Sequence, residues 1–327
     1  MTETRLRSVD AAALAEAAAV LRAGGLVAFP TETVYGLGAN ALDAAAVARI
    51  FAAKGRPANN PIIVHIADFA DLPRVVANWP DAARRLAERF WPGPLTLVLP
   101  RAAAVPDIVT AGGPTVAVRM PAHPVALALI RAAGVPLAAP SANRSGELSP
   151  TTAEHVRRSL SSRIDMILGG GPTQVGLEST VVDLSVTPVR LLRPGHISPA
   201  DIATVIGAIA RQPDVSEAAP LPSPGMLARH YAPRTPTVCL AGSATYVAER
   251  LQRGEKVGWL TFDAAPCDAV TVVMPRAPTE YAARLYAELH ALDQLALDRI
   301  VVEQPPDEEP WLAVGDRLSR AAIPTSG

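Results

Sequence analysis

The sequence has little of several features that would define its class at once. Only two cysteines, Cys239 and Cys267, occur in 327 residues, and they lie far apart. This argues against a cysteine-rich zinc site and against a disulfide framework, so two reduced thiols and no disulfides are expected. The formal net charge is −1 and only 4% of residues are aromatic. No global positive field is therefore available to hold nucleic acid non-specifically.

Membrane and targeting segments are also missing. No apolar run is long enough to span a bilayer. Residues 1–25 mix acidic and basic side chains in an alanine-rich helical pattern, which is typical of neither a signal peptide nor a membrane anchor. The expected compartment is the cytoplasm, with no membrane partner.

Familiar catalytic signatures are absent as well. The sequence contains no Walker A loop, no HExxH helix and no nucleophile elbow. Its six histidines do not stand at metal-ligand spacing, so no metal site built from protein side chains is predicted.

What the sequence does have is a regular alternation of strand-like and helix-like segments. Hydrophobic residues make up 49% of the chain, enough to bury a substantial core. Over residues 1–211 the alternation predicts an α/β domain with a mixed sheet. The predicted helices span 10–22, 43–53, 81–90, 124–133, 152–160 and 199–210, and the predicted strands span 26–29, 62–66, 95–99, 116–119, 137–139, 166–168, 180–184 and 189–192.

The remainder of the chain divides in two. Residues 212–236 hold six prolines with little periodicity, which predicts a stiff, extended connector. Beyond it the alternation restarts and predicts a smaller Rossmann-like α/β domain over 237–327, without the glycine-rich dinucleotide fingerprint. Its predicted strands span 237–240, 257–261, 269–273 and 299–302, and its predicted helices span 244–253 and 280–292.

Cations, amides and hydroxyls gather where the predicted strands of the first domain end. Ligands of open α/β sheets bind in the crevice at strand ends, and Arg and Lys recognise carboxylate and phosphate groups there. The set therefore predicts a site for a multiply charged anion. Its members are Lys54 and Arg56 in a compact loop, Arg119 at the end of a strand, Ser141 and Asn143 in a turn, Ser179 before a strand and Arg193 after one.

Seven short strings in one order indicate a family. They are PTETVYGLG, KGRP with NP behind it, FWPGPLT, VAVRMP, APSAN, GLEST and RPG. Together they resemble the YrdC-like domain of L-threonylcarbamoyl-AMP synthases, and the segment SPGMLARHYAP with the terminal domain resembles the longer, two-domain form. The resemblance implies a YrdC-like catalytic domain over 1–211, a proline-rich linker or lid over 212–236 and a C-terminal domain over 237–327. It also implies a twisted mixed sheet with flanking helices in the first domain.

The resemblance implies a nucleotidyltransferase reaction. L-Threonine and bicarbonate, or dissolved CO2, give an N-carboxylated threonine that ATP adenylylates with release of pyrophosphate. The product, threonylcarbamoyl-AMP, supplies the threonylcarbamoyl group of tRNA (the t6A modification) through a separate transferase, to which the labile product would pass. Mg²⁺ is expected with ATP because it keeps several waters and needs few protein ligands.

The resemblance also implies roles for individual residues. ATP would be bound by Lys54, Arg56, Asn60, Thr115, Ser141, Asn143, Ser149, Arg193 and Tyr231, and the first two would be catalytic by stabilising charge on the phosphates. L-Threonine would be bound by Thr33, His65, Arg119, Ala139 and Ser179, with Arg119 on its carboxylate. Each residue also has a structural interpretation as a turn former, cap, ion-pair member or core histidine. Three roles stay open for Glu32 and Glu178: a structural role, repulsion of phosphate or help in binding a metal.

Two other interpretations stay open. Related domains occur in hydrogenase-maturation proteins that use carbamoyl phosphate, but the zinc-finger and acylphosphatase segments expected there are missing. A YrdC-like domain could also bind RNA on a concave basic surface, although near-neutral charge and few aromatics weaken that view.

Overall fold

The computed structural model describes residues 3–211, 231–263 and 267–323, which form two compact units. The first unit holds residues 3–145 and 150–211, and the second holds residues 231–323 together with the short segment Gly146–Ser149. Most of the predicted linker, including Arg229 and His230 of the proposed lid, lies outside the described residues.

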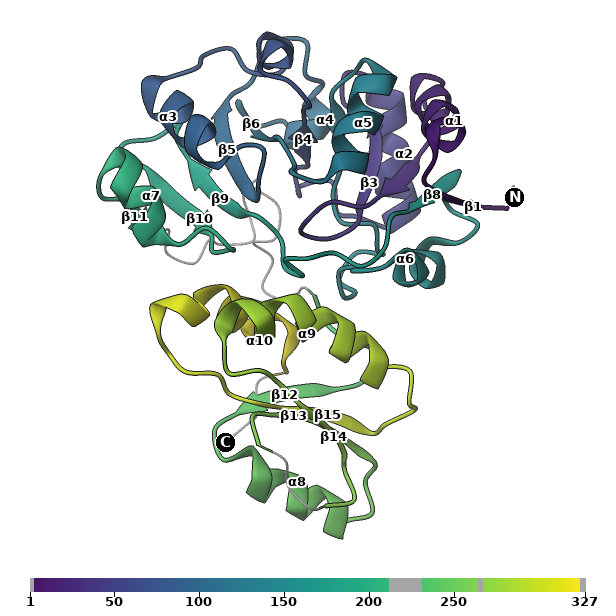
Figure 1. The fold of residues 1–327 in the computed structure, drawn as a ribbon, viewed down its shortest axis with the longest axis vertical. Coiled ribbons are helices and arrows are strands. Elements are labelled where there is room, and N and C mark those ends of the chain that lie inside the picture. The colour runs from purple at the N-terminus through teal and green to yellow at the C-terminus, as the bar shows by residue number, and fades with distance from the viewer. Residues whose placement is uncertain (1–2, 212–230, 264–266, 324–327) are drawn as a thin grey trace. The chain divides into compact units, whose positions relative to one another are not determined.

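The first unit is built on a mixed sheet with the strand order β1-β8-β2-β3-β7-β4-β6-β5-β9-β10-β11 (Figure 1). The sheet contains both parallel pairs, such as β4 with β6, and antiparallel pairs, such as β5 with β6. The predicted mixed sheet with flanking helices is therefore confirmed. The strands are β1 (Arg5–Ser8), β2 (Val27–Phe29), β3 (Gly36–Asn40), β4 (Ile63–His65), β5 (Leu95–Pro100), β6 (Thr115–Arg119), β7 (Leu137–Ala138), β8 (Met166–Gly169), β9 (Thr180–Asp183), β10 (Arg190–Arg193) and β11 (Ala210–Arg211).

Helices cover both faces of this sheet. The helices are α1 (Ala11–Arg22), α2 (Ala44–Lys54), α3 (Asp81–Phe90), α4 (Asp107–Thr110), α5 (Pro124–Ala133), α6 (Ala153–Leu160) and α7 (Pro199–Ile206), with a 3₁₀ turn η1 (Phe69–Arg74). Helices α1 and α5 bury alanine and leucine side chains against β2 and β8, whereas α2, α3, α6 and α7 pack into the core on the opposite face. The Asp10 carboxylate caps α1 by accepting a hydrogen bond from Ala13 N.

On the sheet face that α1 and α5 pack against, a row of apolar residues runs across five other strands. Strand alternation places side chains two residues apart on the same face of a sheet. His65 and Arg119 therefore share this face with Ile63 and Ala117, which belong to the row. Its members are Ile63, Val98, Ala117, Val181 and Leu192, one from each of β4, β5, β6, β9 and β10.

Several elements differ from the sequence prediction. No strand was predicted over Gly36–Asn40, which forms β3 because it pairs with both β2 and β7. The helix predicted over 199–210 ends at Ile206, since Gly207 takes a φ of +83° that a helix does not allow, and Ala210–Arg211 form β11 instead. Strand β1 and the short helices η1 and α4 were not predicted.

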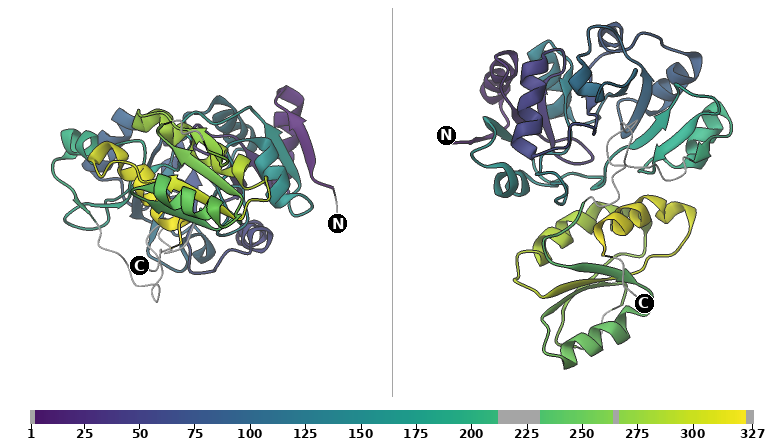
Figure 2. Two further views of the ribbon diagram at one scale, coloured as in Figure 1. Left: turned by 90° about the horizontal axis from the view of Figure 1, so that it is seen from below. Right: turned by 180° about the vertical axis from the view of Figure 1, so that it is seen from behind.

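The second unit is a parallel sheet with the order β12-β15-β13-β14. Helices α9 and α10 lie on one side of it and α8 on the other (Figures 1 and 2). This confirms the smaller parallel α/β domain. Its elements are β12 (Thr237–Leu240), α8 (Ser243–Gln252), β13 (Val257–Thr261), β14 (Val270–Val273), α9 (Pro278–Leu292), β15 (Arg299–Glu303), the 3₁₀ turn η2 (Glu309–Trp311) and α10 (Leu312–Ala321), of which η2 and α10 were not predicted.

The backbone carbonyls of the segment Gly146–Ser149 are held within the second unit by two hydrogen bonds. Ala232 N donates to the Gly146 carbonyl at 3.0 Å, and His290 Nε2 lies 3.1 Å from the Ser149 carbonyl. None of the helices among the described residues is both long and apolar enough to cross a membrane.

Candidate active site

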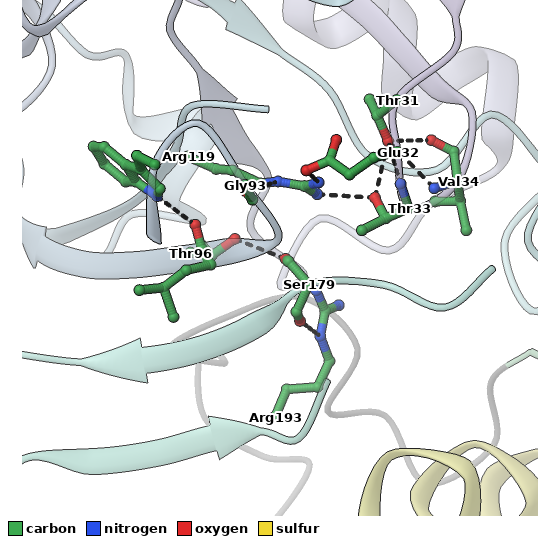
Figure 3. Close-up of polar contacts among 11 residues, drawn as sticks. Thr31, Glu32, Thr33, Val34, Gly93, Thr96, Arg119, Ser179 and Arg193 are labelled. Carbon is green, nitrogen blue, oxygen red and sulfur yellow. Dashed lines mark hydrogen bonds and ion pairs between the residues drawn. The ribbon is translucent and has the colours of Figure 1, made fainter. Parts of the chain in front are cut away.

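The loop after β2 holds three buried polar residues in a hydrogen-bonded turn. Thr31 Oγ1 accepts from the backbone N–H groups of Thr33 (3.2 Å) and Val34 (3.3 Å), and it donates to the Val34 carbonyl at 2.6 Å. Hydroxyl-to-backbone bonds of this kind fix a turn outside the regular ladders. The turn directs Glu32 and Thr33 toward the guanidinium of Arg119 (Figure 3).

Arg119, the last residue of β6, is held on three sides. Its Nε donates to the Gly93 carbonyl at 3.1 Å, its Nη1 donates to Thr33 Oγ1 at 3.0 Å, and its Nη2 lies 2.6 Å from Glu32 Oε1. Only 3% of the residue is exposed. A guanidinium fixed in this way can present its N–H groups to a carboxylate with a defined orientation. The structure thus brings together Thr33 and Arg119, two of the predicted threonine ligands.

His65 lies beside Arg119 on the adjacent strand of the sheet. Parallel strands β4 and β6 pair the two residues in register, and the ring of Phe29 meets the imidazole edge-on at 6.4 Å. Burial, and then the positive charge of Arg119, lowers the pKa of His65 to about 3. The imidazole is therefore neutral near pH 7. Its buried Nδ1 has no hydrogen-bond partner among the described residues, which suits a group that awaits a ligand.

Ser179 and Arg193 form a second contact group. Ser179 Oγ lies 2.7 Å from Thr96 Oγ1, and Arg193 donates from Nε to the Ser179 carbonyl (3.0 Å) and from Nη2 to Ser179 Oγ (3.1 Å) (Figure 3). Gly195 lets the chain after β10 lie against the backbone of Ser179 and Thr180, because a Cβ there would stand 2.4 Å from Thr180 N. Two more predicted residues are therefore in direct contact.

Both groups lie at the same edge of the sheet. Strands β4 and β6 end with His65 and Arg119 at this edge. Strand β5 runs antiparallel to β6, so it begins at the same edge, and its second residue, Thr96, lies beside Arg119. Strand β9 runs parallel to β5, so Ser179 also precedes its strand at this edge, and Arg193 ends the antiparallel β10 there. Ligands of open α/β sheets are bound at such strand ends.

Lys54 closes α2 and reaches the turn after β7. Its Nζ donates to the carbonyl of Ser141 at 2.6 Å and to the carbonyl of Asn143, and its own carbonyl accepts from Ser145 N at 2.9 Å. Gly55, with a φ of +62°, ends the helix directly after it. Lys54 is 3% exposed. The structure therefore fixes a buried ammonium beside the predicted Ser141 and Asn143.

Arg56 and Asn60 brace the loop that follows. Arg56 Nε donates to the Asn60 carbonyl at 3.0 Å, and its Nη2 donates to Asn60 Oδ1 at 2.7 Å and to the Pro61 carbonyl at 2.6 Å. Asn60 is fully buried, and its Nδ2 has no hydrogen-bond partner in the part of the chain that the structure describes. A buried amide donor in this state points to an acceptor on a ligand.

Tyr35 ties the loop after β2 to two other segments. Its hydroxyl donates to the Gly171 carbonyl at 2.7 Å and accepts from Gly170 N at 3.1 Å, while its carbonyl accepts from Ala142 N at 2.8 Å. Burial raises the pKa of Tyr35, so the phenol keeps its proton and both bonds near pH 7. Its hydrogen bonds thus hold the turn of Ser141 and the segment with Gly170 and Gly171 in place.

The other predicted residues stand on further elements. Thr115 begins β6 and faces the same side as Arg119, roughly 13 Å away at about 3.3 Å per residue. Ala139 follows β7, and its N–H is engaged by the Ile63 carbonyl at 2.9 Å. Ser149 and Tyr231 belong to the second unit, where the Tyr231 ring is buried beside Tyr286 and the guanidinium of Arg317. Their roles toward ATP stay predictions.

Acidic and metal-binding side chains do not gather into a cage within residues 3–211, 231–263 and 267–323. No group of three or more His, Cys, Asp or Glu residues there stands close enough to hold a metal ion.

The sequence did not reveal three contacts that shape the site. These are the turn made by the Thr31 hydroxyl, the pairing of Glu32 with Arg119 and the support of Ser179 by Thr96. A signal existed for Thr96, which is a lone hydroxyl at a fully buried position of the apolar strand LTLVLP. A buried hydroxyl requires a partner.

Family profiles match both units. A profile of the Sua5, YciO and YrdC proteins, described as "Telomere recombination", matches residues 19–195. A second profile, described as the C-terminal domain of threonylcarbamoyl-AMP synthase, matches residues 197–323.

Similar proteins span nearly the whole chain. The threonylcarbamoyl-AMP synthase of Pyrococcus abyssi is 46% identical over 316 residues, which cover 94% of this chain and 93% of that protein. The protein of the same name from Bacillus subtilis is 48% identical over 320 residues, covering 94% and 92%. The crystal structure of Pyrococcus abyssi Sua5 complexed with L-threonine matches with a TM-score of 0.91 and 43% identity, over 98% of this chain and 96% of that one.

Proposed function

The chain belongs to the threonylcarbamoyl-AMP synthase family, and on this premise we propose that it adenylylates N-carboxylated L-threonine with ATP. L-Threonine and bicarbonate, or CO2, form the carbamate; a carbamate oxygen attacks the α-phosphate, and pyrophosphate leaves. Threonylcarbamoyl-AMP then passes to a separate transferase that modifies tRNA, a hand-off expected in the cytoplasm.

One observation carries the amino-acid half of this proposal. The buried guanidinium of Arg119 is oriented by Gly93 and Thr33 at a sheet edge where His65 also ends its strand. A carboxylate is the ligand that such a fixed fork recognises best. Thr33 Oγ1, neutral His65 and Ser179 Oγ would then face the hydroxyl and amino groups of threonine.

The nucleotide half rests on the groups around Lys54. Its buried ammonium and the guanidinium of Arg56 would offset charge that develops on the departing pyrophosphate, the electrostatic term that dominates such chemistry. Asn60, Ser141 and Asn143 stand beside these cations and would contact the nucleotide. We assign Thr115, Ser149, Arg193 and Tyr231 to the same ligand on the resemblance alone.

ATP would enter as its Mg²⁺ complex. Mg²⁺ demands six oxygen ligands but keeps several waters, so phosphate oxygens and water can supply its shell. The scarcity of clustered acidic residues in the described part of the chain fits a cation that arrives with the substrate.

The carbamoyl-transfer and RNA-binding interpretations receive less support. The C-terminal profile of the synthase matches residues 197–323, and relatives of that name cover more than nine-tenths of the chain. The buried cation and amide groups also suit small ligands better than an extended RNA surface.

Pyrophosphate release provides the test. The full-length chain is supplied with ATP, Mg²⁺, L-threonine and bicarbonate, and each of the last two is omitted in turn from a reaction freed of CO2. We expect release only when both are present. Turnover of carbamoyl phosphate, or salt-sensitive RNA binding without turnover, would replace this proposal with one of the alternatives.

A further inference from the structure

The Glu32 carboxylate is already paired with the guanidinium on which the carboxylate of a bound amino acid is expected. Glu32 Oε1 lies 2.6 Å from Arg119 Nη2, and the two side chains are 7% and 4% exposed. Arg119 Nη1 and Nε are engaged by Thr33 and Gly93. A substrate carboxylate that binds this guanidinium must therefore meet the carboxylate of Glu32 beside it.

The pairing of Glu32 with Arg119 is incomplete. Neither Oε1 nor Oε2 of Glu32 accepts a well-directed hydrogen bond from any described residue, and Arg119 Nη2 likewise lacks one. Buried carboxylates in native structures normally receive several hydrogen bonds, because an unsatisfied buried charge is costly. Apart from the ion-pair contact of Oε1 with Arg119, both oxygens of this 93% buried side chain lack donors among the described residues, which leaves them able to accept from a ligand.

The charge of the expected substrate decides what that donor is. An amino acid enters as a zwitterion, so it brings a carboxylate and an ammonium one carbon apart. Arg119 can neutralise the first group, but an ammonium buried next to a guanidinium without an anion would be strongly unfavourable. The nearby His65 is neutral and supplies no negative charge.

We propose that Glu32 is the specificity-determining partner of the substrate ammonium. The bound amino acid adds a second pair of opposite charges beside the Glu32–Arg119 ion pair. Its carboxylate contacts Arg119 and its ammonium contacts Glu32. The buried site keeps its net charge, and the Glu32 carboxylate gains hydrogen-bond donors. The hydrogen-bonded turn of Thr31 holds Glu32 in the required place. This inference rests on the proposed function, since it deepens the description of the same site.

The test compares two ligands that differ in one group. L-Threonine carries the ammonium, and (2S,3R)-2,3-dihydroxybutanoate carries a hydroxyl in its place. Their dissociation constants are measured by calorimetry on the full-length wild-type chain and on Glu32→Gln. The wild-type chain should favour threonine by about tenfold or more, the effect of one hydrogen bond to a charged group. In Glu32→Gln this ratio should fall toward one.

A control variant and two opposite outcomes complete this comparison. Asp183→Asn makes the same carboxylate-to-amide change at another buried position of the first unit, on a side chain bonded to Ser185, and should leave the ratio unchanged. If Glu32→Gln weakens both ligands equally, Glu32 only supports Arg119 and the inference is wrong. If it strengthens both equally, Glu32 only competes for Arg119 and the inference is also wrong.

A second measurement needs no variant. In a crystal structure of the wild-type chain with L-threonine, the threonine nitrogen should lie within hydrogen-bond distance of a Glu32 oxygen. A nitrogen placed elsewhere, with Glu32 still on Arg119, overturns the inference. A wild-type chain that binds no L-threonine at all would refute the proposed function itself.

Discussion

His65 and Arg119 are directly paired at the ends of parallel strands β4 and β6, although they lie far apart in the sequence. The pairing explains the electrostatic state of the histidine. Burial and the neighbouring guanidinium both disfavour a second positive charge, and together they lower the pKa of His65 to about 3.

Acid should therefore destabilise the chain through His65. The pKa of this histidine lies below the value of 6.5 expected in the unfolded chain, so the unfolded state takes up the proton first as pH falls. His65 has no effect on stability well above pH 6.5, and its cost grows from there down to about pH 3. At pH 5 it should remove about 2 kcal/mol. Urea unfolding at pH 7.5 and 5 should show this loss in the wild-type chain and its absence in His65→Gln; equal losses in both would contradict the assignment.

Removal of Arg119 should weaken threonine binding without weakening ATP binding. Arg119→Ala loses a charge-assisted contact of roughly 1.5–3 kcal/mol, or about 10- to 150-fold in threonine affinity. Calorimetry with each ligand alone is the measurement. Equal losses for both ligands would indicate a general folding defect instead.

The same variant should also unfold more easily, because it leaves Glu32 buried without its counter-ion. Breaking a buried pair from one side costs about 3–5 kcal/mol. The double variant Arg119→Ala with Glu32→Gln should recover much of that stability while threonine binding stays weak. A double variant no more stable than Arg119→Ala would show that the ion pair is not the cause.

Lys54 should matter for chemistry more than for threonine binding. Lys54→Met removes a cation expected to stabilise the transition state, and loss of one such group costs about 100- to 1,000-fold in kcat. Threonine affinity in the absence of ATP should be unchanged. Lys256→Met replaces the only other lysine of the sequence, an exposed one in the second unit, and should keep wild-type turnover. Wild-type turnover in Lys54→Met would remove this residue from the proposed machinery.

The Thr31 hydroxyl should be needed to present Glu32 and Thr33. Thr31→Val keeps the shape of the side chain but cannot accept from Thr33 N and Val34 N. The loosened turn should lower threonine affinity about tenfold, which corresponds to about one hydrogen bond. Thr31→Ser keeps the oxygen and should retain most of the affinity. A valine variant that binds threonine as tightly as the serine variant would exclude this role.

The sequence predicted much of the architecture because its strongest signals are local. Helix α2 was expected over 43–53 and spans Ala44–Lys54, since an aspartate cap and a following glycine define its ends. Strand β3 was missed because two glycines and an asparagine give Gly36–Asn40 low strand propensity, and only pairing with β2 and β7 makes it a strand. Strand β1, exposed at every residue, likewise exists only through its pairing with β8.

The site was predictable in its residue types but not in its internal contacts. Arg119 and Lys54 stood out as cations at element ends, where local sequence carries the signal. The contact of Glu32 with Arg119, by contrast, depends on a turn and a strand end that only the sheet brings together. No local pattern could show that a glutamate flanked by threonines is paired with an arginine so distant in the chain.

The central claim is that one sheet edge holds an amino acid on Arg119 and a nucleotide on Lys54 at the same time. A crystal structure of the full-length chain with L-threonine and a non-hydrolysable ATP analogue tests it most directly. We expect the threonine carboxylate on the guanidinium of Arg119, the phosphates beside Lys54 and Arg56, and the α-phosphate facing the amino nitrogen across a gap that one carboxylate group can fill. Ligands bound in separate, unconnected regions would contradict the account.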